Sequence, residues 1–378
     1  MEKVMMLTTT AYMSERFNRD NILILEEMGY EVHVVANFDK GNPTTTEVLE
    51  KFKYWIEEHR GKWYSIEIAK SPFDVLNNYK AYMQILKLIK ENRYAFIHCH
   101  TPVGGVLGRV VAHRTHTKVI YTVHGFHFFE GAPLKNWILY YPVEFFLSRW
   151  TDVLITINEE DYQIAKNRFY ARDTKYIPGV GIDLEKFKIG AIDRNSKRKE
   201  LGLRDKDIML LSVGELSPNK NHEMVIRVLK QVEHLEVKYF ICGVGQLEEK
   251  YSLLINELNL EKKVFLLKYR EDVSELCQSA DLYVFPSLRE GLPVALMEAI
   301  ATKRPVLCGK VRGNMDLVKD ERCFFDPQDN EDVLRCILNA LHCDFQEVIE
   351  ENYERLQAFS REKVIHDMVR VYESVAKC

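Results

Sequence analysis

Short apolar segments alternate with amphipathic helical segments along the first half of the chain. Most of the apolar segments contain few polar positions, which is typical of parallel strands that helices cover on both faces. Strands are expected at 4–9, 32–36, 64–68, 96–99, 119–123 and 153–157, and helices at 15–28, 75–91, 105–113, 133–149 and 159–169. This alternation predicts a doubly wound, Rossmann-like α/β domain.

The alternation stops at a turn-rich stretch, 178–183, and starts again near residue 208. Further strands are expected at 208–213, 237–242, 264–266, 282–285 and 305–308, and the tail from 331 to 378 has a helical pattern. We predict two Rossmann-like domains, 1–184 and 185–358, followed by a C-terminal helix, 359–378, that packs back on the N-terminal domain.

Composition limits the class of protein. The 378 residues are 46% hydrophobic and 29% charged, which excludes disordered and fibrous proteins. Basic residues (52) and acidic residues (56) nearly balance, so no nucleic-acid partner is expected. The most apolar stretch, 137–155, contains Glu144, Arg149 and Asp152, whose charges a membrane-spanning helix would have to bury. A cytoplasmic protein is therefore expected.

The eight cysteines are scattered and include no Cys-x-x-Cys pair. Neither a disulfide framework nor a zinc site is expected, and most of the thiols are expected to be reduced and buried. Charge is unevenly distributed along the chain, because residues 51–118 contain 12 basic and 5 acidic side chains. Such a stretch could contact anionic lipid headgroups or a phosphorylated acceptor, although ordinary solvated helix faces are the commoner explanation.

The segment 285–299 carries the clearest chemical signal. It reads as the end of a strand, a polar loop that contains Glu290, and a helix that starts near Pro293. The unpaired N–H groups where a helix starts, here those of Gly291 and Leu292, form a site for an anion. This arrangement predicts a phosphate-binding loop.

Glu298 lies further along the same helix, among apolar residues. A carboxylate in such surroundings is costly unless something donates hydrogen bonds to it, and vicinal sugar hydroxyls are suitable donors. Two solvated glutamates, at 290 and 298, are the alternative interpretation.

Two glutamates separated by seven residues, after a Phe-Pro-Ser sequence, resemble the Glu-x7-Glu motif of glycosyltransferase family 4. Segments similar to further motifs of that family occur in the family's order at 179–183, 213–221, 242–245 and 267–273. The resemblance implies an α/β fold of the GT-B type, in which two Rossmann-like doubly wound domains face each other across a cleft and a helical tail follows. It also implies sugar transfer with retention of the anomeric configuration.

For the donor, the resemblance gives each matching residue a role. Lys220, together with the amides of Gly291 and Leu292, would neutralise a diphosphate and stabilise the charge that develops as it leaves. Glu290 would bind the hydroxyls of the sugar, and Glu298 would bind the ribose.

Further donor contacts are implied by weaker matches. Arg270 and Val273 belong to the segment that resembles the base-binding one, and Gly243 belongs to a Gly-x-Gly that follows a strand. Glu215 stands where the family usually has arginine. This departure removes one cation from the diphosphate site and leaves the role of Glu215 open.

In the first domain, His124 follows a strand at its carboxyl edge, where ligand sites of α/β proteins usually lie. The resemblance places it at the donor sugar. His127 is assigned to the acceptor side, as are Gly104 and Gly105, although helix–sheet packing explains the two glycines equally well.

No metal cofactor is expected. His98 and His100 alternate on one strand without a clear third ligand, and the single Asp-x-Asp, 205–207, precedes a strand rather than following one. By analogy with the family, an oxygen of the leaving phosphate would accept the proton of the acceptor hydroxyl.

The expected function is hexosyl or N-acetylhexosaminyl transfer from a nucleoside diphosphate sugar, with UDP as the preferred nucleotide. The expected acceptor is a hydroxyl of a glycan or of a polyprenyl-diphosphate-linked saccharide. Segments 98–108 and 124–127 resemble those of enzymes that build bacterial surface polysaccharides, which implies exopolysaccharide or capsule synthesis at the inner face of the plasma membrane. Two alternatives stay open: a nucleotide-sugar 2-epimerase of the same fold, and a non-catalytic subunit that binds a sugar nucleotide and regulates a partner.

Overall fold

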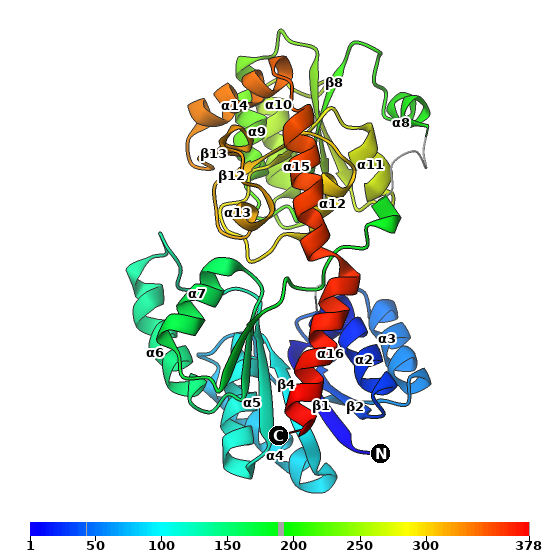
Figure 1. Ribbon diagram of the computed structural model, residues 1–378. Helices are drawn as coiled ribbons and strands as arrows, with labels where there is room; N and C mark the ends of the chain where they lie inside the picture. The colour runs from blue at the N-terminus through cyan, green and yellow to red at the C-terminus, as the bar shows by residue number, and fades with distance from the viewer. Residues whose placement is uncertain (43, 188–192, 378) are drawn as a thin grey trace. The chain divides into compact units, whose positions relative to one another are not determined.

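The computed structural model describes residues 1–42, 44–187 and 193–377, which form two compact units (Figure 1). Unit 1 consists of Met1–Val180 and Glu362–Cys378, and unit 2 consists of Gly181–Arg361. The predicted domain ends, 184 and 358, lie a few residues from these divisions. Each unit has its own parallel sheet and its own core.

Unit 1 is built on a sheet of seven parallel strands in the order β3-β2-β1-β4-β5-β6-β7. The strands are β1 (Lys3–Thr10), β2 (Glu31–Asn37), β3 (Lys62–Ser65), β4 (Tyr94–His100), β5 (Lys118–Val123), β6 (Val153–Thr156) and β7 (Asp173–Tyr176). The inner strands are almost wholly buried, which explains their continuous apolar sequences. The two edge strands depart from expectation because they are polar and half-exposed: β3 lies before its predicted position, and β7 was not predicted.

Helices cover both faces of this sheet. The buried side chains of α1–α3 and α16 form one core with the sheet, and those of α4, α5 and α7 form another on the opposite face, where α6 also packs. The helices are α1 (Ala11–Phe17), α2 (Arg19–Glu27), α3 (Thr46–Glu58), α4 (Val75–Asn92), α5 (Pro102–Thr115), α6 (Leu134–Ser148), α7 (Glu159–Arg168) and α16 (Arg361–Lys377).

The predicted helix at 15–28 is wrong in one respect, because the chain forms two helices with a break at Asn18. Asn18 is fully buried, and it leaves the helical conformation with a φ of −126°. Helix α3 is absent from the expected elements, although Leu49, Phe52 and Ile56 line its buried face.

The final helix, α16, packs within unit 1 (Figure 1). Val364, Met368 and Val371 are buried in the core that α1–α3 share with the sheet. Tyr372 is fully buried, and its hydroxyl shares a hydrogen bond of 2.8 Å with Nδ1 of His98 on β4. The C-terminal helix thereby becomes part of the sheet's own packing.

Unit 2 is built on six parallel strands in the order β10-β9-β8-β11-β12-β13. The strands are β8 (Ile208–Val213), β9 (Val237–Cys242), β10 (Val264–Lys268), β11 (Leu282–Phe285), β12 (Val306–Gly309) and β13 (Phe324–Phe325). The predicted bounds of β8, β9 and β11 are confirmed residue for residue. Strand β13, which has only two residues, was not predicted.

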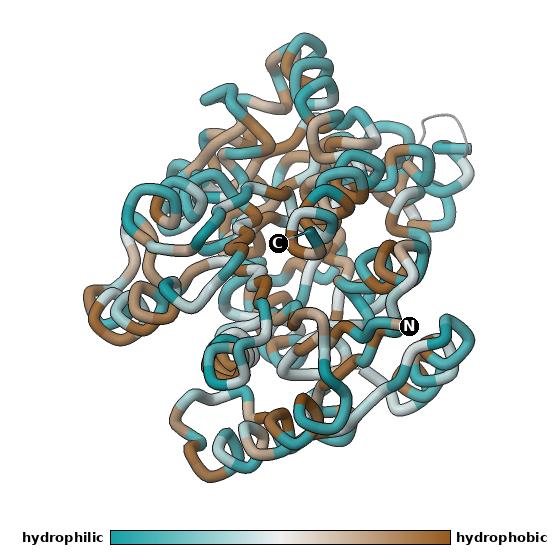
Figure 2. Tube along the Cα trace, turned by 60° about the horizontal axis from the view of Figure 1, so that its bottom comes forward, coloured by the Kyte–Doolittle hydropathy of each residue, from teal (hydrophilic) through white to brown (hydrophobic). Residues whose placement is uncertain are grey.

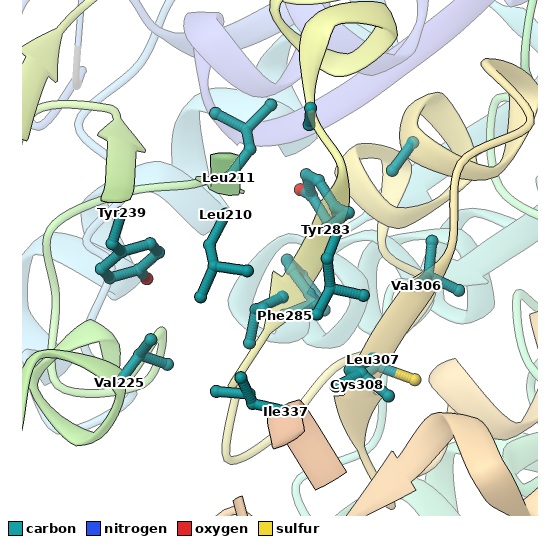
Figure 3. Packing of buried hydrophobic residues seen from close by; sticks show 14 of the residues in the cluster. Leu210, Leu211, Val225, Tyr239, Tyr283, Phe285, Val306, Leu307, Cys308 and Ile337 are labelled. Carbon is teal, nitrogen blue, oxygen red and sulfur yellow. The ribbon is translucent and has the colours of Figure 1, made fainter. Parts of the chain in front are cut away.

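The helices of unit 2 enclose a single large core. Leu210, Tyr239, Tyr283 and Phe285 from neighbouring strands meet there (Figure 3). Hydrophobic stretches run through the interior of both units, and hydrophilic stretches dominate their outer turns (Figure 2). The helices are α8 (Arg194–Glu200), α9 (His222–Gln231), α10 (Glu248–Glu257), α11 (Val273–Ser279), α12 (Val294–Ala301), α13 (Asn314–Leu317), α14 (Asn330–His342) and α15 (Gln346–Leu356), with short 3₁₀ helices η1 (Glu185–Phe187), η2 (Glu321–Cys323) and η3 (Gln357–Phe359).

None of the helices within the described residues is long and apolar enough to span a membrane. The seven cysteines of the described ranges are free, and all except Cys343 are buried; Cys378 lies outside the described residues. Glu144, one of the charges in the apolar stretch 137–155, is buried on α6 and pairs with the fully buried Arg109 of α5 at 2.8 Å.

Breaking this pair should destabilise unit 1. We expect Glu144→Gln to lower the free energy of unfolding by about 3–5 kcal/mol, because the Arg109 guanidinium would keep its buried charge and lose its counter-ion. All four tryptophans lie in unit 1, so tryptophan fluorescence during urea unfolding reports this unit. The double variant Arg109→Met/Glu144→Met should recover most of the loss, and an unchanged midpoint for Glu144→Gln would show that the pair contributes nothing.

Candidate active site

Most candidate residues of unit 2 lie in loops at the carboxyl ends of β8, β9 and β11; Arg270 and Val273 follow β10, and Glu298 lies on helix α12. From β8 the chain runs through β9 to β10 on one side, and β11 continues to β12 and β13 on the other. The sheet therefore has its switch point between β8 and β11, which is where ligands bind in open α/β sheets. The loops are tied together by backbone hydrogen bonds from Gly214 N to Cys242 O (2.9 Å) and from Leu288 N to Asn219 O (2.8 Å).

Lys220 and Glu290 meet directly at this switch point. Nζ of Lys220, from the loop after β8, donates to Oε1 of Glu290, from the loop after β11, at 2.5 Å. The two side chains are 20% and 11% exposed, and the Lys220 ammonium also lies 4.9 Å from the centre of the Phe285 ring. The structure thus brings together the predicted diphosphate ligand and the predicted sugar ligand.

The backbone of the Glu290 loop is fixed from two sides. Asn219 Nδ2 donates to the carbonyl of Arg289 at 2.9 Å, and Arg312 Nε donates to the carbonyl of Glu290 at 3.2 Å. Gly313 has a φ of +77°, and a Cβ there would lie 2.4 Å from the Gly291 carbonyl oxygen. Glycine is therefore needed where the loop after β12 approaches the loop that leads into α12.

Glu298 is half-buried on α12, which starts at Val294 with Pro293 as its N-cap residue. Besides burial, its negative charge raises the pKa of three buried groups: Cys242 at the end of β9, Cys277 on α11 and Tyr283 in β11. Burial raises the pKa of the Cys242 thiol to about 11, with Asp272 and Glu298 adding to the rise, and the Glu298 carboxylate acts in the same direction on Cys277 and Tyr283. Because α12 follows the loop at the carboxyl end of β11, Glu298 lies about one helical turn from that edge of the sheet.

Gly243 allows the loops after β8 and β9 to touch. A Cβ at Gly243 would lie 1.9 Å from the carbonyl oxygen of Gly214. Glu215, next to Gly214, is exposed and has no ion pair or side-chain hydrogen bond within the part of the chain that the structure describes. Nothing in the fold of unit 2 explains the glutamate at this position.

Arg270 is engaged by carboxylates. Its guanidinium donates to Asp272 Oδ1 at 2.7 Å and to Glu200 Oε1 at 3.0 Å, and these bonds raise its pKa. Val273 is half-buried as the first residue of α11. Both residues follow the end of β10, and their contact with a nucleobase stays a prediction.

In unit 1, three histidines gather at the carboxyl ends of β4 and β5. His100 Nδ1 and His124 Nε2 share a hydrogen bond of 3.1 Å, and the His98 and His100 rings lie 4.2 Å apart. Both nitrogens of His98 are occupied, by the hydroxyls of Tyr372 and Thr122, each at 2.8 Å. Burial lowers the pKa of His98 to about 3 and that of His124 to about 4, so these rings are neutral at pH 7.

A small cavity of about 20 Å³ adjoins these rings. It is lined by His100, His124 and Thr122, with Asn21 from α2 and Met368 from α16. His100 is 1% exposed, and its Nε2 atom has no hydrogen-bond partner among the described residues. The sequence indicates His100 only as a possible metal ligand. The signal that finds its present role is the pairing of β4 with β5, which places His100 beside the loop of His124.

The other first-domain candidates have structural contacts. The His127 ring stacks on Tyr140 at 4.4 Å. A Cβ at Gly105 would lie 2.2 Å from the Tyr121 ring, and one at Gly104 would lie 2.9 Å from Thr101 Oγ1. Helix–sheet packing thus accounts for Gly105, and the assignment of these residues to an acceptor stays a prediction.

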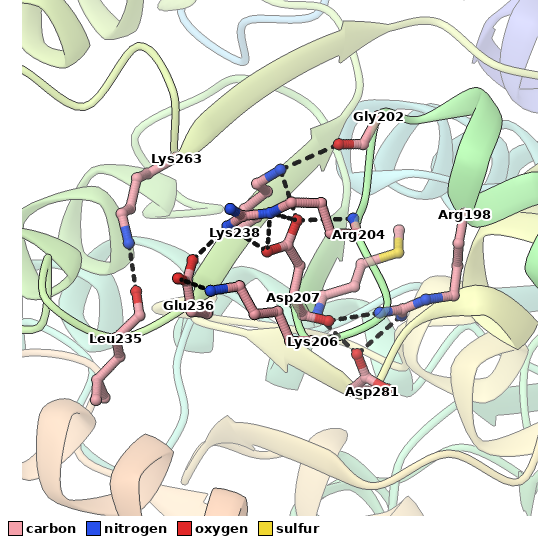
Figure 4. Close-up of polar contacts among 11 residues, drawn as sticks. Arg198, Gly202, Arg204, Lys206, Asp207, Leu235, Glu236, Lys238, Lys263 and Asp281 are labelled. Atoms are coloured by element: carbon pink, nitrogen blue, oxygen red, sulfur yellow. Dashed lines mark hydrogen bonds and ion pairs between the residues drawn. The ribbon is translucent and has the colours of Figure 1, made fainter.

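The Asp-x-Asp sequence lies at the opposite end of the unit 2 sheet, before β8. The Asp207 side chain is fully buried and pairs with Arg204 at 2.7 Å and with Lys238 at 2.8 Å (Figure 4). These cations hold the pKa of Asp207 well below its usual range despite its burial. The Asp207 carboxylate therefore links the start of β8 to β9.

Two family models match the chain. The model described as Glycosyl transferases group 1 matches residues 193–363, and the model described as Glycosyltransferase Family 4 matches residues 15–186. The two matches divide the chain much as the two units do.

Named relatives and solved structures agree with these matches. EpsD of Bacillus subtilis (strain 168), assigned as a glycosyltransferase, is 38% identical over 326 residues, which cover 84% of this chain and 81% of EpsD. The UDP-Gal:alpha-D-GlcNAc-diphosphoundecaprenol alpha-1,3-galactosyltransferase of Escherichia coli is 33% identical over 257 residues, which cover 65% and 66% of the two chains. The fold is similar to that of Anabaena HepE, crystallised with UDP-glucose, with a TM-score of 0.76 at 18% identity over 99% of this chain and all of HepE.

Proposed function

This chain belongs to the glycosyltransferases of family 4 type, and from that premise we propose that it transfers a hexosyl or N-acetylhexosaminyl group from a UDP-sugar to a lipid-diphosphate-linked saccharide, with retention. The donor nucleotide and the acceptor are taken from the Escherichia coli relative, whose name contains both. The general assignment, a group 1 glycosyltransferase of polysaccharide biosynthesis, is supported by the family models and by the names of several relatives.

The single observation that carries the proposal is the contact of Lys220 with Glu290 at the switch point of the unit 2 sheet. A partly buried ammonium beside the N-terminus of α12 is suited to bind a diphosphate. When the diphosphate arrives, Lys220 exchanges a carboxylate for phosphate oxygens. Glu290 is then released to accept hydrogen bonds from the sugar hydroxyls.

The chemical step requires charge stabilisation on the leaving group. As the bond between the anomeric carbon and the phosphate oxygen breaks, negative charge grows on the diphosphate, where Lys220 and the amides of Gly291 and Leu292 stabilise it. The acceptor oxygen forms the new bond on the same face of the sugar. Its proton passes to a phosphate oxygen, so that no protein base is needed.

His124 contributes a neutral imidazole to the proposed mechanism. Its Nε2 is engaged by His100, which leaves Nδ1 for a hydroxyl of the donor sugar. Because burial keeps the pKa of His124 near 4, its protonation should not limit transfer between pH 6 and 8. His127, Gly104 and Gly105 are proposed to lie toward the acceptor.

We propose that the reaction proceeds without a metal ion. The support is chemical: the only Asp-x-Asp sequence is held by Arg204 and Lys238, and Lys220 offers the positive charge that a divalent ion would otherwise supply. Activity that survives EDTA treatment agrees with this, and activity that Mn²⁺ or Mg²⁺ restores after EDTA contradicts it.

A nucleotide-release assay tests the proposed function. The chain is incubated with UDP- and GDP-linked sugars, each with and without a saccharide on a short lipid diphosphate. We expect release that requires the acceptor and is fastest with one UDP-sugar. Formation of an epimer from the donor alone would favour a 2-epimerase, and tight donor binding without turnover would favour a regulatory subunit.

Glu298 should act on nucleotide binding more than on turnover. If it accepts hydrogen bonds from the ribose hydroxyls, Glu298→Ala should weaken UDP binding by about 10- to 100-fold, as expected for a lost hydrogen bond to a charged group. Binding of inorganic pyrophosphate, which has no ribose, should change little. Isothermal titration of both ligands measures this, and equal losses for UDP and pyrophosphate would contradict the ribose role.

A further inference from the structure

Helix α6 exposes an apolar face that the proposed transfer does not use. Leu134, Ile138 and Phe146 are 74%, 68% and 52% exposed, and Leu139 and Val143 are 43% and 42% exposed. Their spacing places them along one side of the helix. Monomeric soluble proteins rarely leave a contiguous apolar surface of this kind without a partner.

The opposite side of α6 is firmly packed, so this exposure does not come from a loosely attached helix. Trp137 and Tyr141 contact the Phe128 ring, with centroids 5.4 and 5.3 Å away. Glu144, the single charged residue between positions 136 and 148, points inward to Arg109. The buried ion pair therefore fixes the rotation of the helix and keeps the outer face free of charge.

Cationic side chains flank this face. Lys135 and Arg149 are exposed beside the two ends of α6. The Arg149 guanidinium lies over the Phe145 and Tyr170 rings at 4.7 and 4.6 Å, and Arg168 lies 6.0 Å from the Trp137 ring. An apolar stripe with aromatic rings and cations at its borders matches the chemistry of an anionic bilayer surface, where the acyl region takes the apolar side chains and the headgroups take the cations.

The basic stretch at 51–118, from which sequence reasoning derived a membrane contact, is less suited. Of its twelve basic side chains, Lys51, Lys53, Lys62 and Lys80 each pair with a glutamate within 3.2 Å, and Arg109 is buried against Glu144. Their positive charges are largely neutralised on the protein itself.

We propose that the outer face of α6 (Leu134, Ile138, Leu139, Val143 and Phe146) docks unit 1 on anionic lipid, with the helix lying in the plane of the interface. The inference is independent of the donor chemistry in unit 2. It supplies a means by which the enzyme could reach an acceptor that is held in a bilayer.

Vesicle flotation with the full chain tests the proposal. The protein is mixed with vesicles of phosphatidylcholine alone or with phosphatidylglycerol at a third of the lipid. We expect it to float with the anionic vesicles, and we expect Ile138→Asp/Val143→Asp to reduce that binding at least tenfold. Leu253→Asp is the matched control, because Leu253 is a 61% exposed leucine on α10 of unit 2, and it should bind like the wild type.

Two control measurements accompany the flotation assay. Circular dichroism should show the same helix content in all variants, and nucleotide release with a water-soluble acceptor should be unchanged in Ile138→Asp/Val143→Asp. Wild-type protein that stays unbound to anionic vesicles would overturn the proposal. So would a wild-type dimer that the double substitution converts to a monomer without any change in vesicle binding, because the face would then join two copies of the chain.

Discussion

Replacing Glu290 by glutamine is expected to lower the rate of sugar transfer by at least about 100-fold, the usual effect of removing one polar group that acts at the transition state. The substitution keeps the size of the side chain and removes its charge, so the sugar hydroxyls meet a neutral amide in place of a carboxylate, and Lys220 loses the negative charge of its partner at 2.5 Å. The measurement is kcat/KM from nucleotide release with saturating acceptor.

The control for this variant is a second Lys–Glu pair in the same unit. Lys230 and Glu233 pair at 2.5 Å, but their side chains are 39% and 52% exposed, and the pair lies at the C-terminal end of α9, at the opposite edge of the sheet from the candidate site. Glu233→Gln should keep wild-type activity. Near-normal transfer by Glu290→Gln would remove this residue from the mechanism.

Lys220→Ala is expected to have an effect of about 100- to 1,000-fold on transfer, because the leaving diphosphate loses the charge that balances it. Binding should change in a characteristic way. Affinity for UDP should fall much more than affinity for uridine, since Lys220 is proposed to contact the phosphates alone. Titration of UDP and of uridine distinguishes the loss of a phosphate contact, which weakens UDP binding alone, from a disrupted pocket, which weakens both.

The two substitutions should not be additive, because Lys220 and Glu290 are in direct contact. The double variant Lys220→Ala/Glu290→Gln should be little slower than the slower of the two single variants. Lys230→Ala is the matched control and should bind UDP like the wild type. An unchanged UDP affinity in Lys220→Ala would contradict the assignment of the diphosphate site.

The sheets could be predicted because their inner strands are buried on both faces, so that an apolar run such as 208–213 has no competing interpretation. The errors fall at polar positions in the pattern. β3 and β7 are polar edge strands, and the helical pattern at 15–28 contains Asn18, a buried polar residue that breaks the helix. Local periodicity does not show which strand lies at the edge of a sheet or which polar residue is buried by tertiary packing.

The candidate site of unit 2 could be assembled from sequence because its residues follow consecutive strands of a parallel sheet, and the ends of such strands share one edge. The direct contact of Lys220 with Glu290 could not be predicted from sequence, because it depends on side-chain conformation. The pairing of His100 with His124 depends on the register of β4 against β5, in which His100 lies opposite Thr122, two residues before His124. Register of this kind is a property of the sheet and not of either strand.

A crystal structure of the chain with UDP bound is the most direct test of the central claim, that Lys220, Glu290 and Glu298 form a nucleotide-sugar site at the switch point of unit 2. We expect the diphosphate to contact Nζ of Lys220 and the amides of Gly291 and Leu292, the ribose hydroxyls to donate to Glu298, and the ion pair between Lys220 and Glu290 to open. UDP bound elsewhere on the chain, with that ion pair still closed, would contradict the account.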